Sequence, residues 1–157
     1  MKSLIALAAL LASFTVQAQL PVVPNPNHDV LLASPDFRLA ANKRLVYDFW
    51  REVFEARHMD LAPKYMAESY MQHNPNVPTG RAAFVDFFSK SPPKPIEERV
   101  RAPLVAIAAD GDLVILVFAR EAAEPKDASK KYTTTWFDMF RIENGKIAEH
   151  WDPAQRQ

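Results

Sequence analysis

The strongest constraint on the fold is a change of hydrophobic periodicity part-way along the chain. Up to about residue 97, apolar side chains recur at the spacing of amphipathic helices. From there on, four segments have the composition of β-strands, and they cover residues 99–109, 113–120, 132–142 and 146–151. Helices first and strands second are typical of the α+β class, so we expect three helices packed on one face of a curved antiparallel sheet that encloses a cavity.

Turn residues indicate how these strands connect. Asp110-Gly111 lies between the first two predicted strands, and Asn144-Gly145 lies between the last two. Asp-Gly and Asn-Gly pairs favour tight hairpins, so the strands should pair as an antiparallel meander. Residues 121–131 are polar, and we expect them to form a loop between the second and third strands.

Capping residues and apolar stripes predict the bounds of the helices. The first runs from Ser34 to about Arg57, with Ser34 as the hydroxyl cap and Pro35 at the first helical position. The second covers residues 60–68, and the third begins after Thr79 and stops before the prolines at 92 and 93. Residues 70–75, between the second and third helices, are too few for a helix and read as a short strand-like segment.

The amino-terminal region differs from the rest. Residues 1–18 combine Lys2, an apolar stretch at 4–16 and small residues before Gln19, which is typical of a cleaved signal peptide. The apolar stretch is shorter than the roughly 20 residues that span a bilayer, so we expect no retained membrane anchor. Three prolines make residues 19–34 an expected linker. Residues 35–157 would then form one domain of a periplasmic or secreted protein.

Composition excludes several classes of function. Nineteen basic and nineteen acidic residues leave no net charge, so nothing indicates binding to nucleic acid. The chain has no cysteine and only three glycines, which removes disulfides, cysteine nucleophiles and phosphate-binding loops. No serine lies in a nucleophile elbow. The functions that remain are proton-transfer chemistry and the binding of a small apolar molecule in a cavity.

Asp138 is the first candidate for such chemistry. On the predicted strand 132–142 it shares its parity with Trp136 and Phe140, so it should point to the same apolar side. Desolvation raises the pKa of a carboxyl group toward the range of a general base at neutral pH. Equally, Asp138 could cap a turn or pair with Arg141 or Arg120 at the open face of the sheet.

The partner of Asp138 depends on the register of the last hairpin. A two-residue turn would set it opposite Trp151, with Glu149 nearby, whereas a three-residue turn with a glycine bulge would set it opposite His150. In the second case a carboxylate and an imidazole share one face, which is an arrangement that fixes a histidine tautomer for proton transfer.

His73 is the other candidate histidine, because turn residues flank its short segment and a side chain there can be rigid yet accessible. A structural role, bonding to a backbone carbonyl, is the alternative. His73 and His150 with Asp138 or Asp152 offer the ligand types of a two-histidine, one-carboxylate metal set. No metal-binding spacing supports that set, so we predict neither a metal nor another cofactor.

Two motifs together resemble the SnoaL-like family of the nuclear-transport-factor-2-like superfamily. They are the segment 70–75, with Gly80 before a Phe-rich helix, and the segment 137–152. The resemblance implies a cone-shaped fold whose helices close a pocket, often dimeric through the outer sheet face. Polyketide cyclases of this family catalyse a cofactor-free intramolecular aldol condensation, with an acid/base aspartate at the position of Asp138. The resemblance also favours His73, His150 and Asp152 as pocket residues.

Two functional hypotheses follow. The first is a cofactor-independent lyase or isomerase acting on a small apolar carbonyl compound, and the second is a non-catalytic periplasmic binding protein with the same pocket. A pocket filled by side chains, leaving only interactions with other proteins, is a third. For the first hypothesis the candidate catalytic residues are Asp138, His73 and His150, and the candidate substrate contacts are Trp50, Tyr70, Trp136, Trp151 and Asp152.

Overall fold

A computed structural model describes residues 20–157, so the predicted signal peptide lies outside the described residues. The helices are α1 His28–Leu32, α2 Phe37–Phe49, the π-helical segment η1 Trp50–Glu55, the 3₁₀ turn η2 Met59–Leu61, α3 Ala62–Tyr65 and α4 Arg81–Phe88. The strands are β1 Met66–Gln72, β2 Leu104–Asp110, β3 Leu113–Glu124, β4 Asp127–Glu143 and β5 Lys146–Trp151. The predicted α+β class is confirmed.

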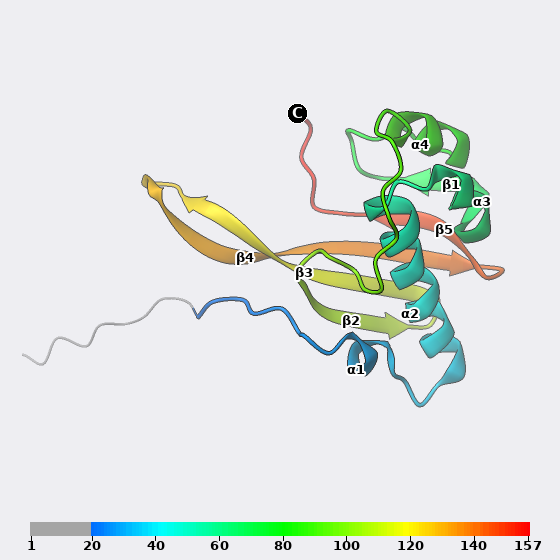
Figure 1. Cartoon of the computed structure of the whole chain (residues 1–157), viewed down its shortest axis with the longest axis horizontal. Coiled ribbons are helices and arrows are strands. Elements are labelled where there is room, and N and C mark those ends of the chain that lie inside the picture. Colours follow the sequence, from blue (N-terminus) through cyan, green and yellow to red (C-terminus); the bar gives the residue numbers. More distant parts are fainter. Residues whose placement is uncertain (1–19) are drawn as a thin grey trace, which may run out of the picture.

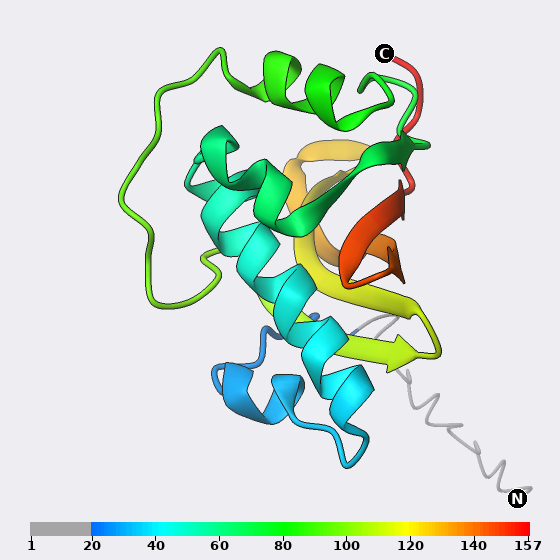
Figure 2. The same ribbon diagram turned by 90° about the vertical axis from the view of Figure 1, so that its right-hand side faces the viewer.

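The five strands form one curved sheet in the order β1-β5-β4-β3-β2. Strands β2 to β5 make the predicted antiparallel meander, whereas β1 pairs in parallel with β5. Figure 2 shows α2 lying across the concave side of this sheet, with α4 beside β1 at one end. The hydrophobic core fills the space between the helices and the sheet, and its largest fully buried side chains include Tyr47, Phe140 and Met66.

Helix ends differ from the predictions by a few residues. The N-cap of α2 is Asp36, whose carboxylate accepts hydrogen bonds from the backbone N–H groups of Arg38 and Leu39. Ser34 Oγ instead accepts a hydrogen bond from the N–H of Asp36, which lies before the first residue of α2. The second helix ends at Tyr65, three residues early, because the chain enters β1 there. These shifts are local and leave each element where its apolar pattern put it.

Two segments expected to be irregular are ordered. Residues 121–131 are not a loop, because β3 and β4 continue through them as a long hairpin that projects from the body (Figure 1). The expected linker contains α1, capped by Asn27. It also packs against the sheet, since Asn25 N–H donates to the carbonyl of Leu104 on the edge strand β2 at 2.8 Å and Val22 N–H donates to the hydroxyl oxygen of Thr133 on β4 at 2.7 Å.

None of the helices among residues 20–157 is long and apolar enough to cross a lipid bilayer.

Candidate active site

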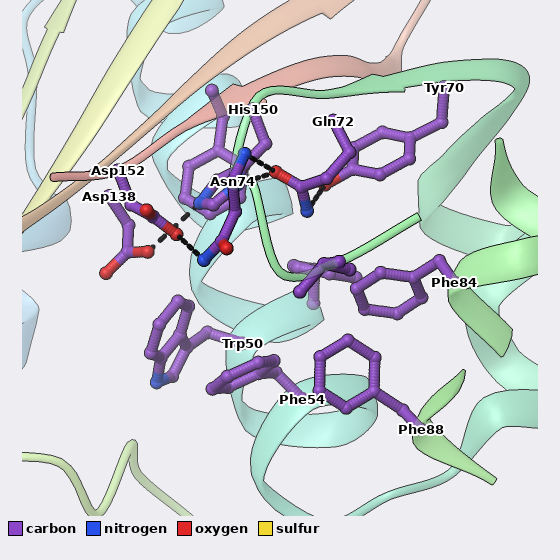
Figure 3. A pocket seen from close by; sticks show the side chains of 13 residues that line it. Trp50, Phe54, Tyr70, Gln72, Asn74, Phe84, Phe88, Asp138, His150 and Asp152 are labelled. Carbon is purple, nitrogen blue, oxygen red and sulfur yellow. Dashed lines mark hydrogen bonds and ion pairs between the residues drawn. The ribbon is translucent and has the colours of Figure 1, made fainter. Parts of the chain in front are cut away.

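A small hollow lies between the concave face of the sheet and the helices. Its volume is about 100 Å³. Aromatic side chains from α2, η1 and α4 form one wall, and polar side chains from β1, β4 and β5 form the other (Figure 3). The lining residues are Phe49, Trp50, Phe54, Tyr70, Gln72, Asn74, Val77, Phe84, Phe88, Asp138, Phe140, His150 and Asp152.

Local geometry explains the aromatic wall. The helix that begins at Phe37 widens into a π-helical segment at Trp50. Such segments are rare and recur at functional sites, because they re-aim side chains relative to a regular helix. Here the segment presents Trp50 and Phe54 to the hollow, with their rings 4.4 Å apart. Phe84 and Phe88, one turn apart on α4, complete the wall.

Asp138 and His150 form a buried pair on the polar wall. Their side chains join β4 to β5, with His150 Nε2 3.0 Å from Asp138 Oδ1. Asp138 is only 3% exposed and His150 only 7%. The other carboxylate oxygen, Oδ2, is buried and has no hydrogen-bond partner among the described residues. One atom of the carboxylate is therefore held in place while the other keeps its capacity to accept a proton.

Neither predicted hairpin register describes how this pair forms. The turn has two residues, since Glu143 pairs with Lys146 and Ile142 with Ile147. The register then shifts by one residue, so that Phe140 pairs with His150. The extra residue is Ala148, within β5, and not a glycine at the turn. This bulge puts His150 on the face of Phe140 and Asp138, because side chains alternate along each strand.

Gln72 fixes the tautomer of His150. The backbone N–H of Asn74 donates to Gln72 Oε1 at 3.0 Å, so this oxygen is an acceptor. His150 Nδ1 lies 2.8 Å from the same oxygen and must carry a hydrogen. His150 Nε2 therefore shares a single proton with Asp138, either as imidazolium and carboxylate or as neutral imidazole and carboxylic acid. That proton can move between Nε2 and Oδ1 without a change in the positions of the two side chains.

The surroundings of Asp138 favour its protonated form. Burial is the largest influence and raises the pKa of Asp138 above its ordinary value. The hydrogen bond and charge of His150 lower the pKa and the negative charge of Asp152 raises it, while Trp136, as an N–H donor, has the smallest lowering effect. The net shift is upward, in the direction that a carboxylate needs to act as a base near neutral pH.

Tyr70 supplies a hydroxyl group to the same wall. It is buried, and its oxygen accepts a hydrogen bond from Gln72 Nε2 at 3.0 Å. Among the hydrogen bonds of the described residues the hydroxyl donates none, so its proton is available to a ligand. Burial, with the charges of Asp152 and Asp138, raises the pKa of Tyr70, which keeps the hydroxyl protonated. Asn74 completes the wall by donating to Asp152 Oδ2 at 2.7 Å.

The structure brings together some predicted site residues and separates others. Trp50, Tyr70 and Asp152 line the hollow with Asp138 and His150. His73 does not, because its side chain is 46% exposed and points to the opposite side of the strand.

There His73 Nε2 lies 2.7 Å from Glu149 Oε1, and the His73 ring stacks on Trp151 at 5.1 Å between centroids. Trp151 is therefore outside the hollow as well. Trp136 is half-buried beside Arg120 and does not line it.

Three groups on the polar wall could hold a metal ion. Ligand atoms of Asp138, His150 and Asp152 lie within 4.8 Å of one another. This set has one histidine, since His73 is elsewhere. The hydrogen bond between His150 and Asp138 already occupies two of the three groups, so an ion would have to replace it.

Sequence reasoning missed Gln72 and Asn74 as site residues. Both follow Tyr70 at alternate positions, 70, 72 and 74, which is the spacing of one face of a strand. That alternation was the available signal. It predicts a shared face, but it does not say which other strand the face meets.

Comparison with known proteins gives the family. Residues 46–150, more than half of the chain, match the SnoaL-like domain. No curated protein matches the sequence. A Mycobacterium tuberculosis epoxide hydrolase of the LEH-like type has a similar structure, with a TM-score of 0.51 and 13% identity over 73% of this chain and 83% of that one.

Two further structures are provisionally described as polyketide cyclases. The protein from Acidithiobacillus ferrooxidans has a TM-score of 0.50 and 19% identity. The match covers 71% of this chain and 86% of that protein's chain. The SnoaL-like protein from Jannaschia has a TM-score of 0.50 and 12% identity, and the match covers 77% of this chain and 91% of that protein's chain. At these identities the likeness shows a shared nuclear-transport-factor-2-like fold and no more. The domain match over residues 46–150 goes further, and the chain belongs to the SnoaL-like family.

Proposed function

We propose that this protein catalyses a cofactor-independent proton transfer on a small, mostly apolar carbonyl compound, as a lyase or isomerase. The observation that carries the proposal is the state of Asp138. This carboxylate is 3% exposed, and it has one oxygen bonded to His150 and the other without a partner among the described residues. Burying such a charge is costly, so the free oxygen readily accepts a proton.

The hollow limits the size of the substrate. A volume of about 100 Å³ is smaller than an apolar cavity of roughly 150 Å³ that holds benzene. Phenyl and indole rings make up most of one wall, which suits a hydrocarbon portion. The carbonyl group would lie toward the polar wall, where the Tyr70 hydroxyl has a proton to donate.

The chemical steps follow from these positions. Asp138 removes a proton from the carbon next to the carbonyl group, and the resulting enolate oxygen accepts a hydrogen bond from Tyr70. His150, held by Gln72, stabilises the charge of Asp138 before the transfer and shares its proton afterwards. Return of the proton to another atom completes an isomerisation. Alternatively, the enolate carbon attacks a second carbonyl carbon, the C=O π bond opens to an alkoxide, and that alkoxide takes the proton from Asp138 to complete an aldol addition.

Hydrogen exchange in D₂O tests this step without knowledge of the natural substrate. Acetone and butanone, which are both smaller than benzene, would be incubated with the protein, and the loss of α-proton signals followed by NMR. We expect catalysed exchange with the wild type, and a loss of about 100-fold or more with Asp138→Asn, as is typical for a general base. Exchange in the presence of a chelator should be unchanged.

His73→Gln is the matched control, because His73 has a carboxylate partner but lies outside the hollow. It should retain wild-type exchange. Equal exchange by Asp138→Asn and the wild type would refute the catalytic proposal.

A non-catalytic binding protein is the second candidate. It is favoured by the hydrogen bonds that hold much of the polar wall rigid, since Gln72 bonds to Tyr70 and His150 and Asn74 bonds to Asp152. Under this alternative the same ketones would perturb the NMR signals of the wall residues with no exchange of α-protons, and Asp138→Asn would change affinity only.

We further propose that the protein acts after export and as a homodimer. The sequence of residues 1–18 supports export, and mass spectrometry of the protein recovered from cells would then find an amino terminus at Gln19. Exposed apolar side chains on the outer face of the sheet support the dimer, with Met71 at 42% and Phe137 at 46% exposure. Sedimentation of the wild type and of Phe137→Lys would measure it.

A further inference from the structure

A second, larger hollow lies outside the candidate active site. Its volume is about 440 Å³, against about 100 Å³ for the first hollow. One side is the end of η1 and the residues up to Arg57, and the other is the segment between α4 and β2, which arcs beside the helix in Figure 2. Phe54 lines both hollows.

Hydrogen bonds hold the two sides of this hollow together. The N–H of Lys94 donates to the carbonyl of Ala56 at 2.8 Å, and His58 Nε2 lies 2.9 Å from the carbonyl of Lys94. At the other end, Arg51 Nη1 donates to the carbonyl of Glu97 at 2.9 Å. The hollow is therefore a built feature with contacts at both ends.

Two of its charged residues already have partners. Glu55 accepts hydrogen bonds from the N–H groups of Arg101 and Ala102 and from Trp50 Nε1. Arg51 is paired with carboxylates of the helix, Asp48 and Glu52. The carboxylates balance the charge of Arg51, whereas the donors to Glu55 are neutral and leave its negative charge on the lining.

Three other cations line the hollow without an anionic partner among the described residues: Arg57, Lys94 and Arg101. None of their side chains has an ion pair or a hydrogen bond in the described part of the chain. Glu55 and Glu97 are the two carboxylates on the lining, so together with the three unpaired cations they leave one net positive charge. Like charges around one hollow repel each other unless an anion lies between them.

Arg57 is the most constrained of the three. Its backbone has φ of 64°, a left-handed conformation that is unfavourable for a residue with a side chain. Its guanidinium group lies 5.1 Å from the ring centre of Phe54 and 4.9 Å from that of Phe88. Nη1 is buried without a partner, and burial lowers the pKa of Arg57. The fold thus holds a desolvated cation at the edge of the hollow.

We propose that this second hollow binds an oxyanion, a carboxylate or phosphate group, between Arg57, Lys94 and Arg101. Guanidinium groups suit both anions because their N–H donors match a pair of oxygens, and the lysine adds a mobile point charge. The site is separate from the Asp138 pair and stands whether or not that pair is catalytic.

Titration with inorganic phosphate and, separately, with acetate tests the proposal at constant ionic strength. Side-chain Nε–Hε signals of arginine in ¹⁵N NMR spectra report the contact directly. We expect saturable shifts for the Arg57 and Arg101 signals, and the tighter of the two anions identifies the preferred group. Arg57→Gln should weaken binding about tenfold or more, as expected for loss of a charge-assisted hydrogen bond.

Lys126→Gln is the matched control, because it removes one positive charge at the far tip of the β3–β4 hairpin. It should bind both anions as the wild type does. If Arg57→Gln does not fold, Lys94→Gln and Arg101→Gln carry the test, since both positions are exposed. Shifts that do not saturate for either anion, or equal weakening by Lys126→Gln, would overturn the proposal.

Discussion

Some residues of the site lower the stability of the fold while giving it the ability to transfer a proton, and Asp138 is the clearest case. Burial raises the pKa of the Asp138 carboxyl group, so the folded state binds a proton more readily than the unfolded state does. The stability of the wild type should therefore fall as pH rises from the ordinary carboxyl range through the raised pKa of Asp138.

Asp138→Asn should be more stable than the wild type at neutral pH. An asparagine at 138 can donate to His150 Nε2 and keeps the geometry without a buried charge. The advantage should be largest above the raised pKa of Asp138 and should vanish near pH 4 and below, where the carboxyl group is protonated in both states. Thermal melts across this range measure it, and an advantage that grows toward acid would contradict the assignment.

Gln72 is a positioning residue, and its removal should be costly for another reason. Gln72→Leu leaves His150 Nδ1 without its acceptor, so we expect a loss of about 1–3 kcal/mol in the free energy of unfolding. The ¹⁵N shifts of His150 should also move toward a mixture of tautomers. Gln155→Leu, at an exposed position, is the control and should change neither quantity.

Secondary-structure elements were predictable where the signal is local, as the start of α2 illustrates. Ser34, Pro35 and Asp36 correctly indicated a helix start, but they offered two capping side chains. The structure uses Asp36, which reaches two backbone N–H groups, whereas Ser34 reaches one outside the helix.

Asp36→Ala should accordingly destabilise the protein by about 1 kcal/mol, the usual cost of losing an N-cap. Ser34→Ala should cost much less, because no N–H group of the helix depends on it. Chemical denaturation of both variants makes the comparison. A larger loss from Ser34→Ala would restore Ser34 as the cap.

Strand β5 shows an element that the sequence did not settle. Its bounds were predicted, yet the bulge at Ala148 was not. A regular ladder from the Asn144-Gly145 turn would have set Asp138 opposite Trp151. One extra residue exchanges the two faces of the strand beyond it, and no local preference of an alanine indicates where that residue sits.

At the scale of the whole molecule, the amino-terminal arm is part of the fold. His28 Nδ1 lies 2.8 Å from the hydroxyl of Tyr47, which also accepts from the N–H of Val100. The arm thereby joins α2 to the segment before β2. Burial, and then the charge of Arg99, lower the pKa of His28, while Asp29 and Glu55 have a smaller opposing effect.

The arm should therefore be held most firmly at neutral pH. The folded state resists protonation of His28, so its contribution to stability is complete above about pH 6.5 and is lost as pH falls through the lowered pKa. Urea unfolding at pH 7.5 and 5 should show a smaller loss for His28→Gln than for the wild type. An equal loss in both would show that His28 is not the titrating group.

The SnoaL-like family and the α+β fold class were predictable because both depend on patterns of residues that are close together in the sequence. Periodicity separates helices from strands, the two X-Gly turns order the hairpins, and the motifs at 70–75 and 137–152 identify the SnoaL-like domain. Asp138 could be selected for the same reason, since its parity on the strand placed it among apolar side chains.

The sequence by itself thus determined the α+β class, the order of the elements and the face on which Asp138 lies, because each follows from neighbours within a few residues. Only the tertiary structure decided that β1 runs parallel to β5, so that Gln72 meets His150 while His73 turns outward to Glu149. Such contacts join residues more than seventy positions apart, and their geometry depends on how the sheet curves and where β5 bulges. No local preference encodes either quantity.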